Sequence, residues 1–154
     1  MHPSTLERTG DQLVLALAEL RELAAGIHPT ILTEAGLGPA LESIAERSAV
    51  PLEVRCACDE RLPSEVEAAA YFVVSEAVAN VSKHARAKRA VATVVRDDGR
   101  LRVEVVDDGV GGADPARGSG LCGLADRIAA LDGRLAVLSP PLGGTRLVAE
   151  IPCA

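Results

Sequence analysis

Apolar residues recur at every third or fourth position in four stretches of the chain, and this period is typical of amphipathic helices. The predicted helices cover residues 4–25, 39–48, 64–84 and about 120–131. Proline opens the second helix and precedes the third, as is common at helix starts. Glycine and proline interrupt residues 26–39, so no regular element is expected there.

Alternating apolar and β-branched residues mark the strands. Strands are expected at residues 51–58, 89–96, 101–106, 134–139 and 145–151. The Asp98-Gly99 pair is a good hairpin signal between the second and third of these strands. Hairpins join antiparallel strands, whereas parallel strands need long crossovers. The pattern therefore predicts an α/β sandwich with an antiparallel or mixed sheet.

Composition limits the class of protein. The chain has 154 residues, of which 48% are hydrophobic and only 1% aromatic, so one compact domain with an aliphatic core is expected. The formal charge of −6 argues against nucleic acid as the partner, because phosphate neutralisation needs clustered Lys and Arg. No apolar run approaches the roughly 20 residues of a membrane span, so we expect either a soluble cytoplasmic protein or an excised cytoplasmic fragment, without direct membrane contact.

Four cysteines are spread along the chain, at Cys56, Cys58, Cys122 and Cys153. They show neither paired C-x-x-C spacing nor nearby histidine ligands, so a zinc site is not expected. We expect reduced thiols with mostly structural roles.

The helix predicted at 64–84 has two different faces. Its core face is formed by Ala70, Val74, Ala77, Val78 and Val81. Glu76, Asn80 and Lys83 stand in one row, with His84 beside them. The row is either a solvated face with ion pairs, or a site where the Asn80 amide holds Mg²⁺ and the Glu76 carboxylate orients or deprotonates a nucleophile. Asparagine is a poor interior helix former, which favours the second interpretation.

A glycine-rich stretch follows the predicted strand at 101–106. Asp107-Asp108-Gly109 looks like a hairpin turn, but residues 110–120 continue with glycine and other small side chains. An acid at the end of a strand can accept a hydrogen bond from the exocyclic amine of a base, and glycines let the backbone approach a ligand closely. The alternative is a mobile surface loop.

Gly118, Gly120 and Gly123 have the G-x-G-x-x-G spacing of dinucleotide-binding loops. Their surroundings do not fit that function, because no strand precedes them and no acidic residue stands about 20 positions further on. The free N–H groups at the start of the helix predicted near residue 120 suit a phosphate group instead.

Together these pieces resemble the GHKL ATP-binding domain of sensor histidine kinases. Glu76-x3-Asn80-x2-Lys83-His84 is similar to the N box of that family. Its two glycine boxes and last hairpin are matched by Asp107-x-Gly109-x-Gly111, Gly118-x-Gly120-Leu121-x-Gly123 and Gly143-Gly144-Thr145. Residues 20–41 resemble the junction of the nitrate-sensor-like subfamily. The resemblance implies a two-layer α/β sandwich of GHKL, or Bergerat, type with a mixed, largely antiparallel sheet packed on helices.

The resemblance also implies how ATP is bound. Asp107 would accept a hydrogen bond from the adenine amine, and Thr145 would support that contact. Asn80 would bind Mg²⁺, while Lys83 and His84 would face the phosphates. The family's phenylalanine box has no counterpart, since the only phenylalanine is Phe72 in the long helix.

The same resemblance assigns the catalytic carboxylate to Glu76. The end of an ATP lid would lie where backbone amides at the helix start meet the triphosphate. The remaining residues of the implied nucleotide site are Gly109, Gly111, Gly118, Gly120, Leu121 and Gly123.

The resemblance divides the chain into the end of a dimerisation helix with its junction, residues 1–36, and a catalytic domain, residues 37–154. The family's phosphoacceptor histidine precedes an acidic residue, but His2 and His28 each precede proline and His84 belongs to the N box. We therefore expect Mg-ATP binding without autophosphorylation, and γ-phosphate transfer to a histidine on a dimerisation domain absent from this chain. The other expected partners are a response regulator and, in a full-length kinase, a second copy of the protein.

Two other functions share this ATP fold. An anti-sigma-factor-type serine kinase would have no helical junction before residue 40, and residues 20–29 count against it. An interaction module that holds ATP without transfer would not need the Glu76 carboxylate.

Overall fold

The computed structural model describes residues 10, 13, 29–113 and 119–153. Most of the helix predicted at 4–25 lies outside these residues, as do His2, His28 and Gly118. The helical elements are α2 (Thr30–Ala35), α3 (Leu37–Arg47), α4 (Ser64–Asn80), the π-helical turn η1 (Val81–Ala85) and α5 (Ser119–Ala130). The strands are β1 (Leu52–Ala57), β2 (Ala90–Asp97), β3 (Arg100–Asp107), β4 (Arg134–Leu138) and β5 (Thr145–Pro152).

The five strands form one mixed sheet in the order β1-β2-β3-β5-β4. β1 runs parallel to β2, and the other three neighbouring pairs are antiparallel. Helix α4 lies between β1 and β2 in the chain and supplies the crossover that a parallel pair requires. The predicted hairpin is present, with Asp98 and Gly99 both at positive φ. The prediction of a mixed, largely antiparallel sheet is confirmed.

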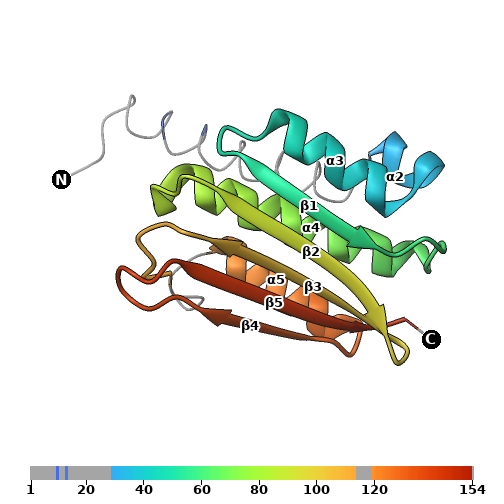
Figure 1. The fold of residues 1–154 in the computed structure, drawn as a ribbon. Coiled ribbons are helices and arrows are strands. Elements are labelled where there is room, and N and C mark those ends of the chain that lie inside the picture. The colour runs from blue at the N-terminus through green and yellow to red at the C-terminus, as the bar shows by residue number, and fades with distance from the viewer. Residues whose placement is uncertain (1–9, 11–12, 14–28, 114–118, 154) are drawn as a thin grey trace.

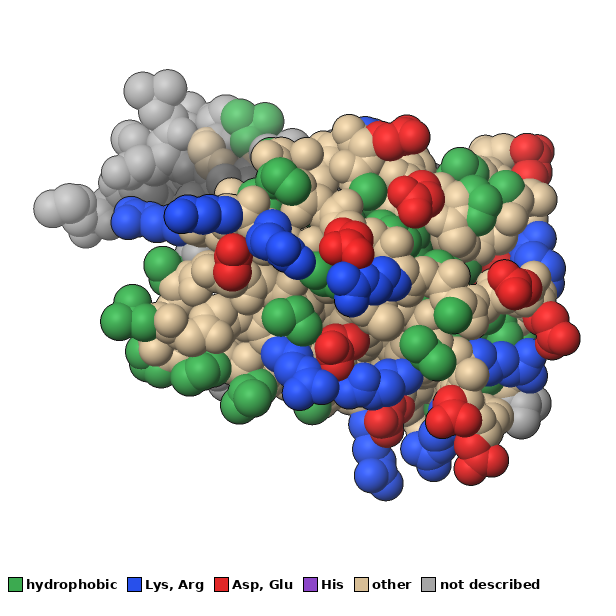
Figure 2. Space-filling view, viewed as in Figure 1, with side chains coloured by type: hydrophobic (Ala, Val, Ile, Leu, Met, Phe, Trp, Pro, Cys, Tyr) green, Lys and Arg blue, Asp and Glu red, His purple; other side chains and the backbone are tan. Residues whose placement is uncertain are grey.

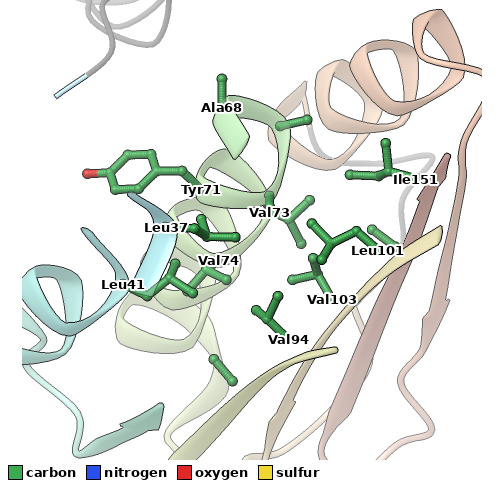
Figure 3. Close-up of a cluster of buried hydrophobic side chains, with 14 of the residues drawn as sticks. Leu37, Leu41, Ala68, Tyr71, Val73, Val74, Val94, Leu101, Val103 and Ile151 are labelled. Carbon is green, nitrogen blue, oxygen red and sulfur yellow. The ribbon is translucent and has the colours of Figure 1, made fainter. Parts of the chain in front are cut away.

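Helices α4 and α5 lie behind the sheet in Figure 1, and α3 packs against β1 and α4. The core lies between these two layers, where Val73 and Val74 of α4 approach Leu101 and Val103 of β3 (Figure 3). The core face predicted for the long helix is buried at all five positions, four in α4 and the last, Val81, at the start of η1. Since α4 contacts α3, α5 and the sheet, it is the central helix of the domain.

The opposite face of the sheet carries charged side chains. The Glu104 carboxylate on β3 binds Arg102 at 3.0 Å and Arg146 of β5 at 2.8 Å, and Glu53 pairs with Arg55 on β1. Figure 2 shows basic and acidic side chains interleaved across this view of the molecule. Exposed pairs of this kind add little to stability. They do keep this face polar, and no described helix covers it. The described part of the chain is therefore a two-layer sandwich of one sheet and its helices.

Three elements differ from the sequence expectations. The stretch 26–39 contains a short helix, α2, which buries only Leu32, so its apolar pattern is too short to detect. Helix α3 begins at Leu37, two residues before Pro39. The helix predicted to reach His84 becomes a π-helical turn after Asn80, because a pattern of 3.6 residues per turn does not reveal a local widening.

A buried carboxylate joins α2 to α4. Glu67 of α4 has only 4% of its side chain exposed, and Arg61 binds it through Nε at 2.9 Å and through a terminal nitrogen at 3.1 Å. The same guanidinium donates to the carbonyls of Leu32 and Thr33 in α2. The Leu62 N–H also donates to Glu67, at 3.0 Å. These bonds pair the buried charge and hold α2 on α4.

Candidate nucleotide site

Asp107, the last residue of β3, is a buried acid with 8% of its surface exposed. Its Oδ1 accepts a hydrogen bond from the Gly109 N–H at 2.8 Å. Thr145, the first residue of β5, faces Asp107 in the β3–β5 register. No other described residue donates to the Asp107 carboxylate, so its second oxygen has no partner among the described residues.

Two glycines bring the loop after β3 against the β4–β5 connection. A Cβ on Gly111 would overlap the Pro140 carbonyl, and a Cβ on Gly144 would overlap the Asp107 carbonyl. Their φ angles are +68° and +72°, values that favour glycine. Gly111 is therefore required by contact with the protein's own backbone. The sequence pattern alone could not show whether this glycine is needed for contact with the protein's own backbone or for close approach to a ligand.

The second half of α4 carries the polar row predicted from the sequence. Glu76 and Asn80 are half-buried and lie one helical turn apart. Lys83 is exposed on the π-helical turn, and the wider turn places it at a different angle from the one a regular helix gives. Glu76 and Asn80 are thus aligned as the sequence predicted, whereas Lys83 is turned away from their line.

The start of α5 lies directly against Glu76. A Cβ on Gly120 would overlap the Glu76 carboxylate, so glycine at this position leaves the space that the carboxylate occupies. The first N–H groups of a helix have no partner within it and attract anions. A carboxylate from the N box and a helix start from the second glycine box therefore meet, although they lie far apart in the sequence.

The other residues expected in the glycine boxes have different surroundings. Leu121 is 7% exposed and packs in the hydrophobic core, where it anchors the first turn of α5. Gly123 has open space where its Cβ would be. His84 lies in η1, but its side chain, like all of Gly118, is outside what the structure describes.

Sequence reasoning missed one polar residue at this end of the sheet. Ser139, directly after β4, has its hydroxyl 2.6 Å from the Thr145 hydroxyl and accepts the Ala113 N–H at 2.9 Å. A serine before two prolines gives no signal of such a contact. The proximity depends on how the loop after β3 and the β4–β5 connection pack together.

The polar side chains around Asn80 fit a metal ion that is held mainly by the phosphates of a bound substrate and only partly by the protein. The described residues contain no group of three or more His, Cys, Asp or Glu side chains able to hold a metal ion. Mg²⁺ keeps several waters and is commonly bound through one or two protein groups together with substrate phosphates. The half-buried Asn80 amide beside Glu76 suits that arrangement.

The four cysteines are free thiols. Burial raises the pKa of the Cys56 and Cys58 thiols, which keeps them protonated. Within the described ranges, no helix combines the length and the hydropathy needed to cross a membrane.

The fold is a two-layer sandwich, in which a buried acid ends β3 and a carboxylate of α4 lies against the start of α5. This combination is that of an ATP-binding domain of the GHKL class. The sequence profile of the histidine kinase-, DNA gyrase B-, and HSP90-like ATPase family matches residues 65–154, more than half of the chain. The chain belongs to this family.

Its relatives are sensor histidine kinases, as the motifs indicated. It is 32% identical to the sensor histidine kinase MctS of Rhizobium johnstonii, over 96% of this chain and 34% of that protein. It is 30% identical to the nitrate/nitrite sensor protein NarX of Escherichia coli, over 93% of this chain and 25% of that protein. The chain thus spans between a quarter and about a third of the length of these curated relatives.

A solved structure has the same fold. The histidine kinase domain of the blue-light activated histidine kinase of Erythrobacter litoralis matches with a TM-score of 0.60 at 28% identity. The match covers 77% of this chain and 60% of that one. The predicted GHKL sandwich is confirmed.

Proposed function

We propose that this chain binds Mg-ATP and donates the γ-phosphate to a histidine on a dimerisation domain of a two-component kinase. The observation that carries the proposal is the contact between Glu76 and Gly120. It joins a carboxylate suited to proton chemistry to a helix start suited to phosphate. Membership in the ATPase family and similarity to sensor histidine kinases support the same function.

The base of ATP binds where β3 ends and β5 begins. The second oxygen of Asp107 accepts a hydrogen bond from the adenine amine, and Thr145 lies beside it. The N–H groups at the start of α5 bind the phosphates. Lys83 and His84 belong to the π-helical turn and face the phosphates, Lys83 with its positive charge and His84 as a hydrogen-bond donor.

Phosphoryl transfer depends mainly on positioning and on neutralising charge. Mg²⁺, held by the Asn80 amide oxygen and by ATP oxygens, supplies that neutralisation when bound. Glu76 orients the incoming nucleophile or accepts its proton, and its contact with α5 keeps it beside the phosphate-binding helix start. Gly118 and Gly123 complete the glycine box from which that helix starts.

The remaining partners follow from this chemistry. We place the acceptor histidine on the dimerisation domain of a homodimeric kinase, and the phosphoryl group then passes to a response regulator. Residues 1–36 form the end and junction of that dimerisation region, and residues 37–154 form the catalytic domain. ATP and response regulators are cytoplasmic, so this domain works in the cytoplasm.

Calorimetric titration with ATP, with and without Mg²⁺, tests the binding step. The parent chain should bind ATP more tightly with Mg²⁺ present. Asn80→Ala should lose most of that increase, because the amide oxygen that binds the metal is removed and no charge is added. The same Mg²⁺ dependence in variant and parent would remove Asn80 from the metal site.

A second variant separates binding from transfer. Glu76→Gln should keep the ATP affinity within a few-fold while abolishing transfer in a full-length kinase, since the carboxylate acts on the nucleophile and not on bound ATP. Parental transfer rates in this variant would reject the catalytic role of Glu76.

A further inference from the structure

Strand β1 is one edge of the sheet, and alternate backbone groups along it have no partner among the described strands. In the order β1-β2-β3-β5-β4, β1 pairs only with β2. The Ala90 N–H donates to the Pro51 carbonyl at 2.9 Å, so the odd-numbered residues of β1 direct their backbone groups to β2. The N–H and C=O groups of Leu52, Val54 and Cys56 therefore point away from β2, where another strand could pair with them.

Helix α3 lies along this edge and forms a groove with it (Figure 1). The groove has a volume of about 690 Å³ and is lined by Val54 and Cys56 of β1 and by residues of α3, among them Glu42 and Glu46. A Cβ on Gly38 would lie 4.0 Å from the Cys56 sulfur, so the start of α3 approaches the strand closely. An exposed sheet edge beside a groove for alternate side chains is the geometry that binds an extended peptide as an added strand.

Two acidic side chains give this groove its charge. Glu42 and Glu46 are exposed, and no described residue forms an ion pair with either of them. They lie one turn apart on α3, at a rise of about 6 Å along the helix axis. Alternate residues of a strand are about 6.6 Å apart and point to the same face. Two basic residues at positions i and i+2 of an added strand therefore match the two glutamates in spacing and in charge, and their aliphatic stems cover Val54 and Cys56.

Charge also distinguishes between the occupants that this groove could have. A second copy of the chain that paired β1 with β1 would bring its own α3, with its own Glu42 and Glu46, towards the first pair of glutamates. Residues 1–28 contain two arginines and four acidic residues, and their apolar period predicts a helix, so they do not offer a basic strand. The groove thus fits a basic segment of another protein.

We propose that the groove between α3 and β1 binds an extended basic segment of a partner protein, which joins the sheet as an added strand. The backbone of the segment pairs with Leu52, Val54 and Cys56, and its alternate Lys or Arg side chains reach Glu42 and Glu46. Strand β2 separates β1 from β3 and β5, so this surface is distinct from the candidate nucleotide site. The inference therefore does not depend on the proposed function.

Titration of the full chain with a fluorescently labelled peptide, Thr-Lys-Thr-Lys-Thr-Lys-Thr, tests this surface by anisotropy. The parent chain should bind the peptide, and a peptide with glutamate in place of each lysine should not bind. Combining Glu42→Gln with Glu46→Gln should weaken binding about ten-fold, because two ion pairs are lost. Combining Glu65→Gln with Asp126→Asn is the matched control, since it removes two exposed charges outside the groove and should leave binding as in the parent.

Methylation of the peptide backbone asks whether the peptide binds as a strand. In an added strand, the N–H groups of alternate residues point to β1 and the others point to solvent. Methylating the backbone nitrogens of the lysines, or those of the threonines, gives two peptides of equal charge, of which one should lose binding and the other should keep it. No binding to the parent chain, equal affinity of the two methylated peptides, or equal loss in the two double variants would overturn the inference. Self-association of the chain that Glu42→Gln with Glu46→Gln strengthens would also overturn it, because it would assign the edge to a second copy.

Discussion

Asp107 and Asp108 are adjacent acids with different surroundings. Asp107 is buried and uses one oxygen on the Gly109 N–H. Asp108 is exposed, and its Oδ1 accepts the N–H groups of Arg89 at 3.1 Å and Lys88 at 2.8 Å. These bonds lower the pKa of the Asp108 carboxyl. Asp108 thus binds the backbone just before β2, whereas the second oxygen of Asp107 has no partner among the described residues.

Asp107→Asn should weaken ATP binding by about 1–3 kcal/mol, because the amide can present a donor to the donor amine of adenine. Calorimetric titration measures the change. Asp108→Asn is the matched control and should bind ATP as the parent does. An unchanged affinity in Asp107→Asn would exclude Asp107 from the adenine site.

Gly120 and Gly123 lie one turn apart on α5 but differ in what an added methyl group would meet. At Gly120 it would displace the flexible end of Glu76, so Gly120→Ala should fold and yet reduce transfer in a full-length kinase by about ten-fold or more. At Gly123 the space is open, so Gly123→Ala should raise the free energy of unfolding by about 0.5–1 kcal/mol. Urea unfolding measures the free energy of unfolding of each variant, and transfer assays measure its rate of phosphoryl transfer. Equal transfer rates in the two variants would contradict the Glu76 contact.

At the scale of elements, α4 connects two ends of the domain. Its first turn holds Glu67, which binds Arg61 and through it the carbonyls of α2. Its last turns hold Glu76 and Asn80. The position of Glu76 and Asn80 relative to α2 therefore depends on helix α4 and on the ion pair between the buried Glu67 and the half-exposed Arg61.

The stability contributed by this ion pair should depend on pH. Burial alone would raise the pKa of Glu67, but the hydrogen bonds from Arg61 and the Leu62 N–H lower it below 4.5 overall. A carboxyl whose pKa is lower in the folded state stabilises fully above its unfolded pKa and loses this contribution as pH falls through the folded value. The free energy of unfolding should thus decline below about pH 4.5.

Glu67→Gln should cost about 2 kcal/mol near neutral pH, because Arg61 loses its charged partner. The difference from the parent should shrink in acid, where the parent carboxyl is protonated. Urea unfolding across the pH range measures it, with the exposed Glu65→Gln in the same turn as control. A difference that stays constant down to strongly acidic pH would contradict the assignment.

At the scale of the whole molecule, the chain on its own should bind ATP without forming a stable phosphohistidine. None of its three histidines precedes an acidic residue, and transfer requires an acceptor nitrogen in line at about 3 Å from the γ-phosphate. Incubation with labelled ATP and Mg²⁺ should leave the chain unlabelled. Adding a separate dimerisation hairpin that carries an acceptor histidine should restore labelling. The labelling should be weak, because the hairpin is not tethered to this chain and its effective concentration is low.

Acid-labile phosphate on this chain alone, removed by His28→Ala, would make His28 the acceptor. It would also overturn the expectation that the acceptor lies on a domain outside this sequence. His84→Ala is the matched variant, because His84 is proposed to bind phosphates and should not carry the label.

The sequence was most informative where one period extends through an element. The strand predicted at 89–96 is β2 at Ala90–Asp97, and the helix predicted at 120–131 is α5 at Ser119–Ala130. It was least informative for α2, whose six residues bury one side chain, and for the parallel pairing of β1 with β2. A single strand carries no signal of which neighbour it joins or in which direction.

By itself, the sequence determined the succession of helices and strands, the core face of α4 and the order of the polar and glycine motifs, because each depends on neighbours along the chain. Only the tertiary structure decided which groups meet. Glu76 reaches Gly120, Ser139 reaches Thr145 and Gly111 reaches Pro140 through the packing of α4 on α5 and the joining of two loops at one end of the sheet. These contacts depend on register and packing across the whole core, which no local pattern encodes.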